Sequence, residues 1–372
     1  MDYEQLLKEM SRQKDEMTTL ERMMAYAKGE EVDHIPFMLI GADTAASLYG
    51  YTMGDYRRDL DVRWDIMEKM EKEFGTAAAG IGIGLKSIGE AVGSTVKYPE
   101  EGIDFVAEHM LKDYSQLDSM DITDPYKCPN LLEIIESFKK TKERFPHYGS
   151  GNNVAGPIST AASIRRVEDI LRDTVLKKDE LHRLLDYSVQ CTLRWVEVVT
   201  KEFGPLPVNI SDPVASMSVL SKKQFLEFEK PHLKDLVEGI KNITGRMPTV
   251  HICGKTRKIW EDLLELGFTS LSVDNCEDIG EVKNCVGDRM RISGNVPPVE
   301  VLKCGTIDEV IQSVHDCIQK ASDSPMGYAL AAGCQIPPLT PRENLYAYIY
   351  AARKYGRGAK KGQLCKGLFD EE

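Results

Sequence analysis

The sequence predicts an α/β fold of the (β/α)8 TIM-barrel type with an N-terminal helical extension, and three observations support this. Apolar strand-like runs alternate with amphipathic helical stretches, which is typical of parallel βαβ units. The chain has 372 residues, a length that single α/β barrels reach. Polar residues follow the strand-like runs, and a barrel gathers strand ends at one rim, whereas a doubly wound sheet, which the alternation also fits, spreads them along an edge. We therefore expect one barrel domain over residues 1–372.

Residues 1–30 are expected to form N-terminal helices. Thr18 and Glu21 fit a capping box, and Gly29 fits the position just after a helix end. The other expected elements before residue 150 are a strand at Ile35–Ile40, a helix at Asp59–Phe74, a loop or short strand within Ala77–Gly93 and a helix at Leu131–Phe145.

Strands and helices alternate regularly after that point. The last helix is expected to begin at a capping box of Thr340 and Glu343, with Pro341 at its first position. Residues 357–372 are expected to form a flexible tail. The expected strands are Asn153–Ala155, Pro207–Ile210, Thr249–Ile252, Ser270–Val273, Met290–Ser293 and Tyr328–Leu330, and the expected helices are Thr160–Ile170, Leu181–Phe203, Lys222–Ile240, Thr256–Leu266, Ile279–Val286 and Ile307–Lys320.

Composition indicates an acidic cytoplasmic protein. Hydrophobic residues make up 42 %, charged residues 28 %, and the net charge is -12, so we expect neither nucleic acid nor an anionic membrane surface as a partner. The N-terminus shows no signal peptide, and no apolar run approaches the roughly eighteen residues of a spanning helix. Nine cysteines without a secretion signal indicate reduced thiols rather than disulfides.

One imidazole and two thiols follow strand-like runs and could bind zinc. His251 and Cys253 are two residues apart, so on a strand they point to the same side, and Cys334 follows another strand. Three protein ligands leave tetrahedral zinc one open position, as in catalytic sites. The same residues also fit a core histidine with two buried cysteines, and Cys276 is either a fourth ligand or a small buried residue.

Four further polar residues are candidates for substrate binding. Asp212, Asp274 and Asn295 stand at strand ends, and Glu90 follows a glycine-rich stretch. Each aspartate could instead cap the next helix, and Glu90 could be a solvated carboxylate. The run Gly80–Gly84 matches neither a Rossmann fingerprint nor a P-loop.

The strand-end motifs resemble the uroporphyrinogen decarboxylase superfamily, from about Arg22 to Tyr355. Decarboxylases of this superfamily carry an arginine-rich segment where this chain reads Ile40–Thr44, and a histidine where it has Cys334. The stretches that carry the resemblance are Ala155–Pro157, Leu220–Ser221, Leu271–Asp274, Ser293–Asn295 and Thr340–Asn344.

Within the superfamily, the chain looks like the corrinoid-linked branch of methylcobamide:coenzyme M methyltransferases. The resemblance implies that His251, Cys253 and Cys334 bind zinc, and that a partner protein supplies the corrinoid. It implies methyl transfer between that protein and a thiol; the alternatives are demethylation of methoxylated aromatics and decarboxylation. The motifs that match the branch are Val250–Lys255, Ile210–Ser216, Gly333–Cys334 and Glu90–Gly93.

Overall fold

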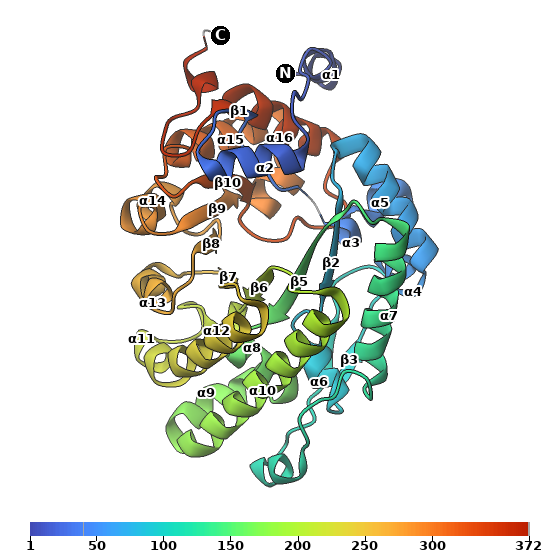
Figure 1. The fold of residues 1–372 in the computed structure, drawn as a ribbon, viewed down its shortest axis with the longest axis vertical. Coiled ribbons are helices and arrows are strands. Elements are labelled where there is room, and N and C mark those ends of the chain that lie inside the picture. The colour runs from blue at the N-terminus through green and yellow to red at the C-terminus, as the bar shows by residue number, and fades with distance from the viewer. Residues whose placement is uncertain (40, 371–372) are drawn as a thin grey trace. The chain divides into compact units, whose positions relative to one another are not determined.

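The computed structural model describes residues 1–39 and 41–370, and these group into two compact units. Unit 1 comprises Met1–Thr76 and Ser270–Glu372, and unit 2 comprises Ala77–Thr269. In both units parallel strands alternate with helices, as the sequence predicts (Figure 1). No helix of the described residues has both the length and the apolar character needed to cross a membrane.

Unit 1 contains three parallel strands in the order β10–β9–β8. Residues Tyr328–Ala332 pair in register with Ile292–Val296, and Ser270–Ser272 pair with Arg291–Ser293. The elements of unit 1 are α1 (Tyr3–Met10), α2 (Thr19–Lys28), β1 (Val32–His34), α3 (Ala42–Ala45), η1 (Ala46–Tyr49), α4 (Met53–Arg58), α5 (Leu60–Phe74), β8 (Ser270–Val273), α14 (Ile279–Val286), β9 (Arg291–Val296), η6 (Pro298–Lys303), α15 (Ile307–Ala321), β10 (Tyr328–Ala332), α16 (Arg342–Tyr355), β11 (Arg357–Ala359) and η7 (Lys366–Phe369).

The strand position at residues 36–38 pairs with β10, the last strand of the parallel sheet. The Met38 N–H donates to the Leu330 carbonyl at 2.9 Å, and the Leu330 N–H donates to the Pro36 carbonyl at 2.9 Å. Phe37 and Leu330 therefore form a parallel bridge. A barrel requires its first and last strands to be neighbours, whereas doubly wound sheets keep them apart. The predicted strand at 35–40 is thus short, and its residue 40 lies outside the described residues.

Unit 2 contains four parallel strands in the order β2–β5–β6–β7. Its elements are β2 (Ala78–Gly82), α6 (Ser87–Ala91), the antiparallel hairpin β3 (Thr95–Lys97) and β4 (Phe105–Glu108), η2 (Tyr114–Ser119), α7 (Pro129–Arg144), β5 (Gly149–Ala155), α8 (Pro157–Ile164), α9 (Val167–Leu176), α10 (Lys178–Phe203), β6 (Val208–Ser211), η3 (Pro213–Ala215), α11 (Lys222–Gln224), η4 (Phe225–Glu229), α12 (Lys230–Thr244), β7 (Thr249–Ile252), η5 (Arg257–Ile259) and α13 (Trp260–Glu265).

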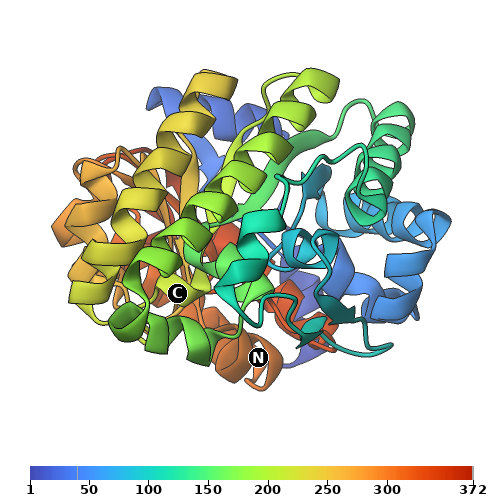
Figure 2. The ribbon, with the colours of Figure 1, turned by 90° about the horizontal axis from the view of Figure 1, so that it is seen from below.

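The long helices α10 and α12 of unit 2 pack side by side (Figures 1 and 2). Trp195 of α10 is fully buried, and its indole N–H donates to Asn152 Oδ1 of β5 at 3.0 Å. The helix is thereby fixed to the sheet by both apolar burial and a hydrogen bond.

Two predicted helical features are wrong because side chains bond to other groups than the pattern suggests. The helix expected at 160–170 breaks after Ile164, because Arg165 is extended and its buried guanidinium donates to Asp173 at 2.7 Å. The final helix begins at Arg342 without a side-chain cap, because the Thr340 hydroxyl donates to the Pro337 carbonyl instead.

The C-terminal residues 357–369 are structured, which corrects the predicted flexible tail. β11 pairs antiparallel with β1, in the register Val32 to Ala359 and His34 to Arg357. Cys365 is fully buried, and its N–H donates to Ser322 Oγ. The polar, glycine-containing composition of this stretch does not reveal these contacts. The partners of β11 lie more than 300 positions earlier, and the partner of Cys365 lies 43 positions earlier. The N-terminal prediction is confirmed, including the capping box of Thr18 and Glu21.

Candidate functional site

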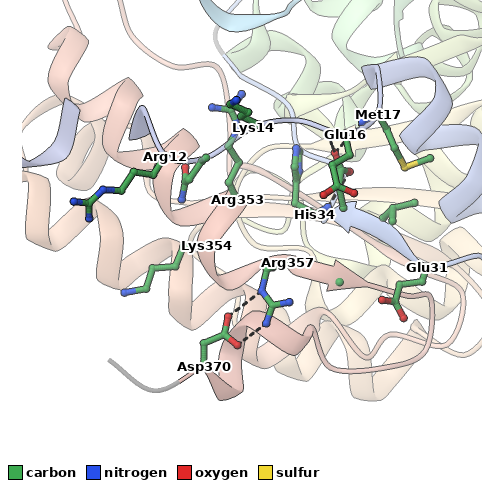
Figure 3. Close-up of a pocket in the computed structure, with 14 residues that line it drawn as sticks. Arg12, Lys14, Glu16, Met17, Glu31, His34, Arg353, Lys354, Arg357 and Asp370 are labelled. Atoms are coloured by element: carbon green, nitrogen blue, oxygen red, sulfur yellow. Dashed lines mark hydrogen bonds and ion pairs between the residues drawn. The ribbon is translucent and has the colours of Figure 1, made fainter. Parts of the chain in front are cut away.

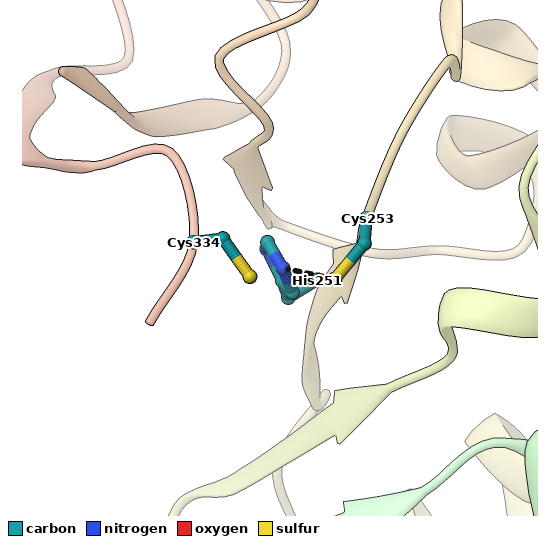
Figure 4. A group of neighbouring side chains, drawn as sticks. All are labelled: His251, Cys253 and Cys334. Carbon is teal, nitrogen blue, oxygen red and sulfur yellow. Dashed lines mark hydrogen bonds between the residues drawn. The ribbon is translucent and has the colours of Figure 1, made fainter. Parts of the chain in front are cut away.

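His251 and Cys253 form a close pair at the carboxyl end of β7. His251 Nε2 lies 3.1 Å from Cys253 Sγ, and both side chains are half-buried (Figure 4). Strand pairing positions the histidine, because Ser211 of β6 is its register partner and the Asp212 N–H donates to its carbonyl at 2.9 Å. The expectation that these two side chains share one side of the strand is therefore confirmed.

A sharp turn directly follows Cys253. Gly254 has φ +80°, and a Cβ atom there would lie 2.7 Å from the hydroxyls of Ser216 and Ser218. The Lys255 N–H donates to Ser218 Oγ at 3.1 Å. Glycine is required here because the backbone is left-handed and closely packed. The turn ties the loop after β7 to the loop after β6 and fixes where Cys253 points.

Asp212 is fully buried behind His251, at the N-terminus of α8. Its Oδ1 accepts hydrogen bonds from the Ser159 N–H at 3.1 Å and the Ser159 hydroxyl at 2.5 Å. A Cβ atom on Gly156 would lie 1.9 Å from Asp212 Oδ2, so only glycine fits beside it. The carboxylate therefore anchors the end of β6 to α8, while the Asp212 N–H binds the His251 carbonyl. Its direct contact with substrate stays a prediction.

Glu229 is a second fully buried carboxyl beside Asp212, and the sequence analysis missed it. Its Oε2 accepts from the Ile158 N–H at 3.2 Å. Burial raises the pKa of Glu229 well above its usual range, and the charge of Asp212 raises it further. Burial likewise raises the pKa of Asp212, to about 6. We therefore assign the proton to Glu229, whose carboxyl then donates to Asp212. The available signal was its position four residues after Phe225, on an apolar helix face.

Glu90 lies on α6 in the same unit and is half-buried. Its Oε2 accepts from the Tyr98 hydroxyl at 2.7 Å and from Asn130 Nδ2 at 3.1 Å. Asn130 also donates to the Ser87 carbonyl at 2.9 Å, so the carboxylate is held in a defined orientation. Its role in substrate binding stays a prediction.

Cys334 follows β10 in unit 1 and is half-buried (Figure 4). The preceding Gly333 donates its N–H to the Val296 carbonyl at 2.9 Å, and a Cβ atom there would lie 2.4 Å from the Asn275 nitrogen. The following Gln335 donates to Asp43 Oδ2 at 2.8 Å. Contacts on both sides therefore fix the backbone at Cys334.

The Asn295 side chain is hydrogen-bonded to the backbone of Asp274 in unit 1, which gives Asn295 a structural role. Its amide is buried and donates to the carbonyls of Asp274 at 3.1 Å and Glu277 at 2.6 Å. Both amide hydrogens thus support the loop after β8, and the substrate contact of Asn295 stays a prediction. Asp274 Oδ1 accepts from the Cys276 N–H at 2.9 Å. Asp278, not Asp274, caps the N-terminus of α14. Cys276 is exposed rather than buried.

Unit 1 also has an open cavity of about 770 Å³, whose lining does not include Cys334. Figure 3 shows this cavity. The cavity adjoins β1, which precedes the strand position at residues 36–38. Cys334 instead follows the carboxyl end of β10, the parallel strand that pairs with that position. Its buried acid Asp33 pairs with Arg22 at 2.6 Å, and Asp15 pairs with Arg353 at 2.8 Å. Since these acids already have cationic partners, we assign the cavity's charges to stability, as is usual at this end of a barrel.

Comparison with known proteins identifies the family of this chain. A family model described as Uroporphyrinogen decarboxylase (URO-D) matches residues 18–355. This chain belongs to the uroporphyrinogen decarboxylase family. The family resemblance predicted from the motifs is therefore confirmed.

Relatives in this family include methyltransferases of Methanosarcina species. Methylcobamide:CoM methyltransferase MtaA of Methanosarcina barkeri is 30% identical over 226 residues, which cover 60% of this chain and 63% of MtaA. The chain thus matches somewhat less than two thirds of that relative. Methylcobamide:CoM methyltransferase MtbA of Methanosarcina mazei is 25% identical over 351 residues, 91% of this chain and 99% of MtbA.

A solved structure confirms the fold. A methyltransferase from Methanosarcina mazei matches with a TM-score of 0.76 at 23% identity, covering 91% of this chain and 99% of that chain. The predicted α/β barrel class is therefore confirmed, and the pairing of residues 36–38 with β10 is its local signature.

Proposed function

We propose that this protein is a zinc-dependent methyltransferase that moves a methyl group between the corrinoid of a partner protein and a thiol. The observation that carries the proposal is the His251–Cys253 pair at the end of β7, with 3.1 Å between Nε2 and Sγ. The names of MtaA and MtbA, which specify methylcobamide and CoM, support the corrinoid and the thiol. We also propose that it acts in the cytoplasm.

The geometry of the pair fits a shared zinc ion. Zinc binds imidazole nitrogen at about 2.0–2.1 Å and cysteine sulfur at about 2.3 Å, so tetrahedral ligands of these two kinds lie about 3.6 Å apart. The observed 3.1 Å reaches that value with a shift of about half an ångström, which half-buried side chains can make. The Gly254 turn and the Asp212 hydrogen bond hold the backbone while the side chains adjust.

Cys334 is the third ligand in this proposal. In a (β/α)8 barrel all strand carboxyl ends face one rim, and Cys334 follows β10 as Cys253 follows β7. One imidazole and two thiols are donor types that can hold a metal ion together. Two cysteinates would neutralise the charge of zinc and leave one position open for a reactant.

The protein side chains would bind and orient the reactant at this site. When bound, zinc would favour the thiolate form of an acceptor thiol, which is only a few per cent ionised at neutral pH when its pKa is about 8.5. His251 and Cys253, fixed by the turn behind them, would hold that thiol in one orientation for attack on the methyl group. The buried Asp212–Glu229 pair would keep the β6 and β7 ends in register.

A turnover assay tests the proposal. Purified protein is given methylcobalamin with a panel of thiols, tetrahydrofolate and, in the reverse direction, cob(I)alamin with methoxyarenes; porphyrinogen decarboxylation is measured alongside. We expect methylation of a thiol, and a loss of at least about 10- to 100-fold in Cys253→Ser and Cys334→Ser.

Cys276→Ser is the matched control, because Cys276 also follows a strand of the sheet but is exposed and outside the ligand set. It should keep wild-type activity. Decarboxylation without methyl transfer, or full methyl transfer by Cys253→Ser, would contradict the proposal. Methyl uptake from a methoxyarene instead of transfer to a thiol would change the substrate and keep the metal site.

A further inference from the structure

A second group of metal-binding side chains lies between α10 and α12 of unit 2, two helices that pack side by side (Figures 1 and 2). Asp186 belongs to α10, and His232 and Asp235 belong to the first turns of α12. One ligand atom of each lies within 4.8 Å of the other two. Residues three apart share a helix face, so His232 and Asp235 both face α10.

His232 is buried, and one of its ring nitrogens has no hydrogen-bond partner. The residue is 5% exposed, and no donor or acceptor in the described residues satisfies Nδ1 by hydrogen-bond geometry. A buried polar atom without a partner is unfavourable. Nδ1 nevertheless lies 3.0 Å from Asp186 Oδ1, so it faces the acidic side chains without being well aligned to them.

The distance between His232 Nδ1 and Asp186 Oδ1 fits two ligands of one metal ion. Two atoms bound at about 2.1 Å lie about 3.0 to 3.4 Å apart when the bond angle is between roughly 90° and 110°. The observed 3.0 Å between His232 Nδ1 and Asp186 Oδ1 is at the lower end of that range. The carboxylates are exposed, so an ion can enter from solvent.

The other ring nitrogen of His232 is arranged to leave Nδ1 available. Its Nε2 lies 2.9 Å from His182 Nδ1, and the His182 ring stacks on Phe228 with centroids 4.9 Å apart. If Nε2 carries the proton and donates it to His182, Nδ1 keeps its lone pair, as in metal-bound histidines whose second nitrogen is hydrogen-bonded.

We propose that Asp186, His232 and Asp235, here called the helix site, bind a divalent transition-metal ion. One imidazole and two carboxylates suit Zn²⁺ or a similar borderline ion, and an all-oxygen site for Ca²⁺ or Mg²⁺ would not need the histidine. The two carboxylates neutralise the ion, which links α10 to α12. The helix site is independent of the proposed catalytic zinc.

Zinc counting on the full-length chain tests the inference. Equilibrium dialysis followed by elemental analysis should give about two Zn²⁺ per wild-type chain, and about one in His232→Gln. Because His232 is buried, the double variant Asp186→Asn/Asp235→Asn, which changes exposed side chains, provides a second test and should also give about one. Glu238→Gln, on the same helix but paired with Lys234, is the matched control and should keep two.

Cobalt substitution distinguishes the helix site from the proposed catalytic site. Co²⁺ at the helix site has no thiolate ligand and gives no sulfur-to-cobalt charge-transfer band. Loss of the helix-site ion therefore leaves the charge-transfer band of the proposed catalytic site and the methyl-transfer rate unchanged. Zinc counts that are equal in the wild type and in both helix-site variants would overturn the inference. A weaker charge-transfer band in Cys253→Ser, with the helix-site ion retained, concerns only the catalytic site.

Discussion

Replacing Glu229 by glutamine should change how stability depends on pH. In the folded protein burial and Asp212 raise the pKa of Glu229 well above 4.5, so the native state keeps a proton that the unfolded chain releases. A carboxyl whose pKa is raised in the folded state contributes stability that is fully present below the pKa of the unfolded chain. This stability is lost as the pH rises towards the folded pKa. Wild-type stability should therefore fall with pH across this window.

The size of the effect follows from the proton linkage. One proton bound only in the native state changes the free energy of unfolding by about 1.36 kcal/mol per pH unit. Glu229→Gln keeps the shape and a donor towards Asp212 but binds no proton. Above the usual titration range of glutamate it should therefore gain about 1.36 kcal/mol per pH unit relative to the wild type, until the pH reaches the raised pKa of Glu229.

Urea denaturation of both proteins at several pH values measures this difference. Taking the variant minus the wild type cancels the titration of groups that do not contact Glu229. Glu227→Gln, a half-buried change on the same helical segment, serves as the control, because Lys178 lowers the pKa of Glu227 and its titration lies at lower pH. Stability curves that stay parallel for Glu229→Gln and the wild type would refute the shared-proton arrangement.

Three further predictions concern the supports of the site. Gly156→Ala should destabilise by about 3 kcal/mol, because its Cβ would lie 1.9 Å from Asp212 Oδ2, while Gly151→Ala, whose nearest contact is 3.6 Å away, should change thermal stability by less than about 1 kcal/mol. Asn295→Leu should lose about 2–4 kcal/mol and speed hydrogen exchange at residues 274–277, since two carbonyls lose their donor; unchanged exchange would argue against this role. Burial and Asp274 raise the pKa of Cys276 to about 12, so at about pH 8 it should alkylate at least about tenfold more slowly than a peptide thiol, and Asp274→Asn should speed it, as mass spectrometry can follow.

Local patterns were enough to predict much of the fold. The strands Thr249–Ile252 and Ser270–Val273 and the helix Ile279–Val286 have the predicted bounds, because apolar periodicity and β-branched residues act over a few positions. The pairing of His251 with Cys253 also followed from strand geometry alone. These features depend on neighbours in the sequence.

Features that depend on distant partners could not be predicted in this way. The helix break at Arg165 exists because Asp173 and the carbonyl of Leu111 receive its guanidinium. Asn295 was predicted from its strand-end position to bind substrate, and the hydrogen bond of its amide to the Asp274 loop was not predicted. Glu229 gains its importance only through Asp212, which belongs to a different element.

The most direct test of the account is the charge-transfer spectrum of the cobalt-substituted protein. We predict a thiolate-to-cobalt band that loses about half its intensity in either Cys253→Ser or Cys334→Ser and gains intensity when an acceptor thiol binds. A band that is unchanged in Cys334→Ser would contradict the proposal that the two cysteines and His251 hold one metal ion.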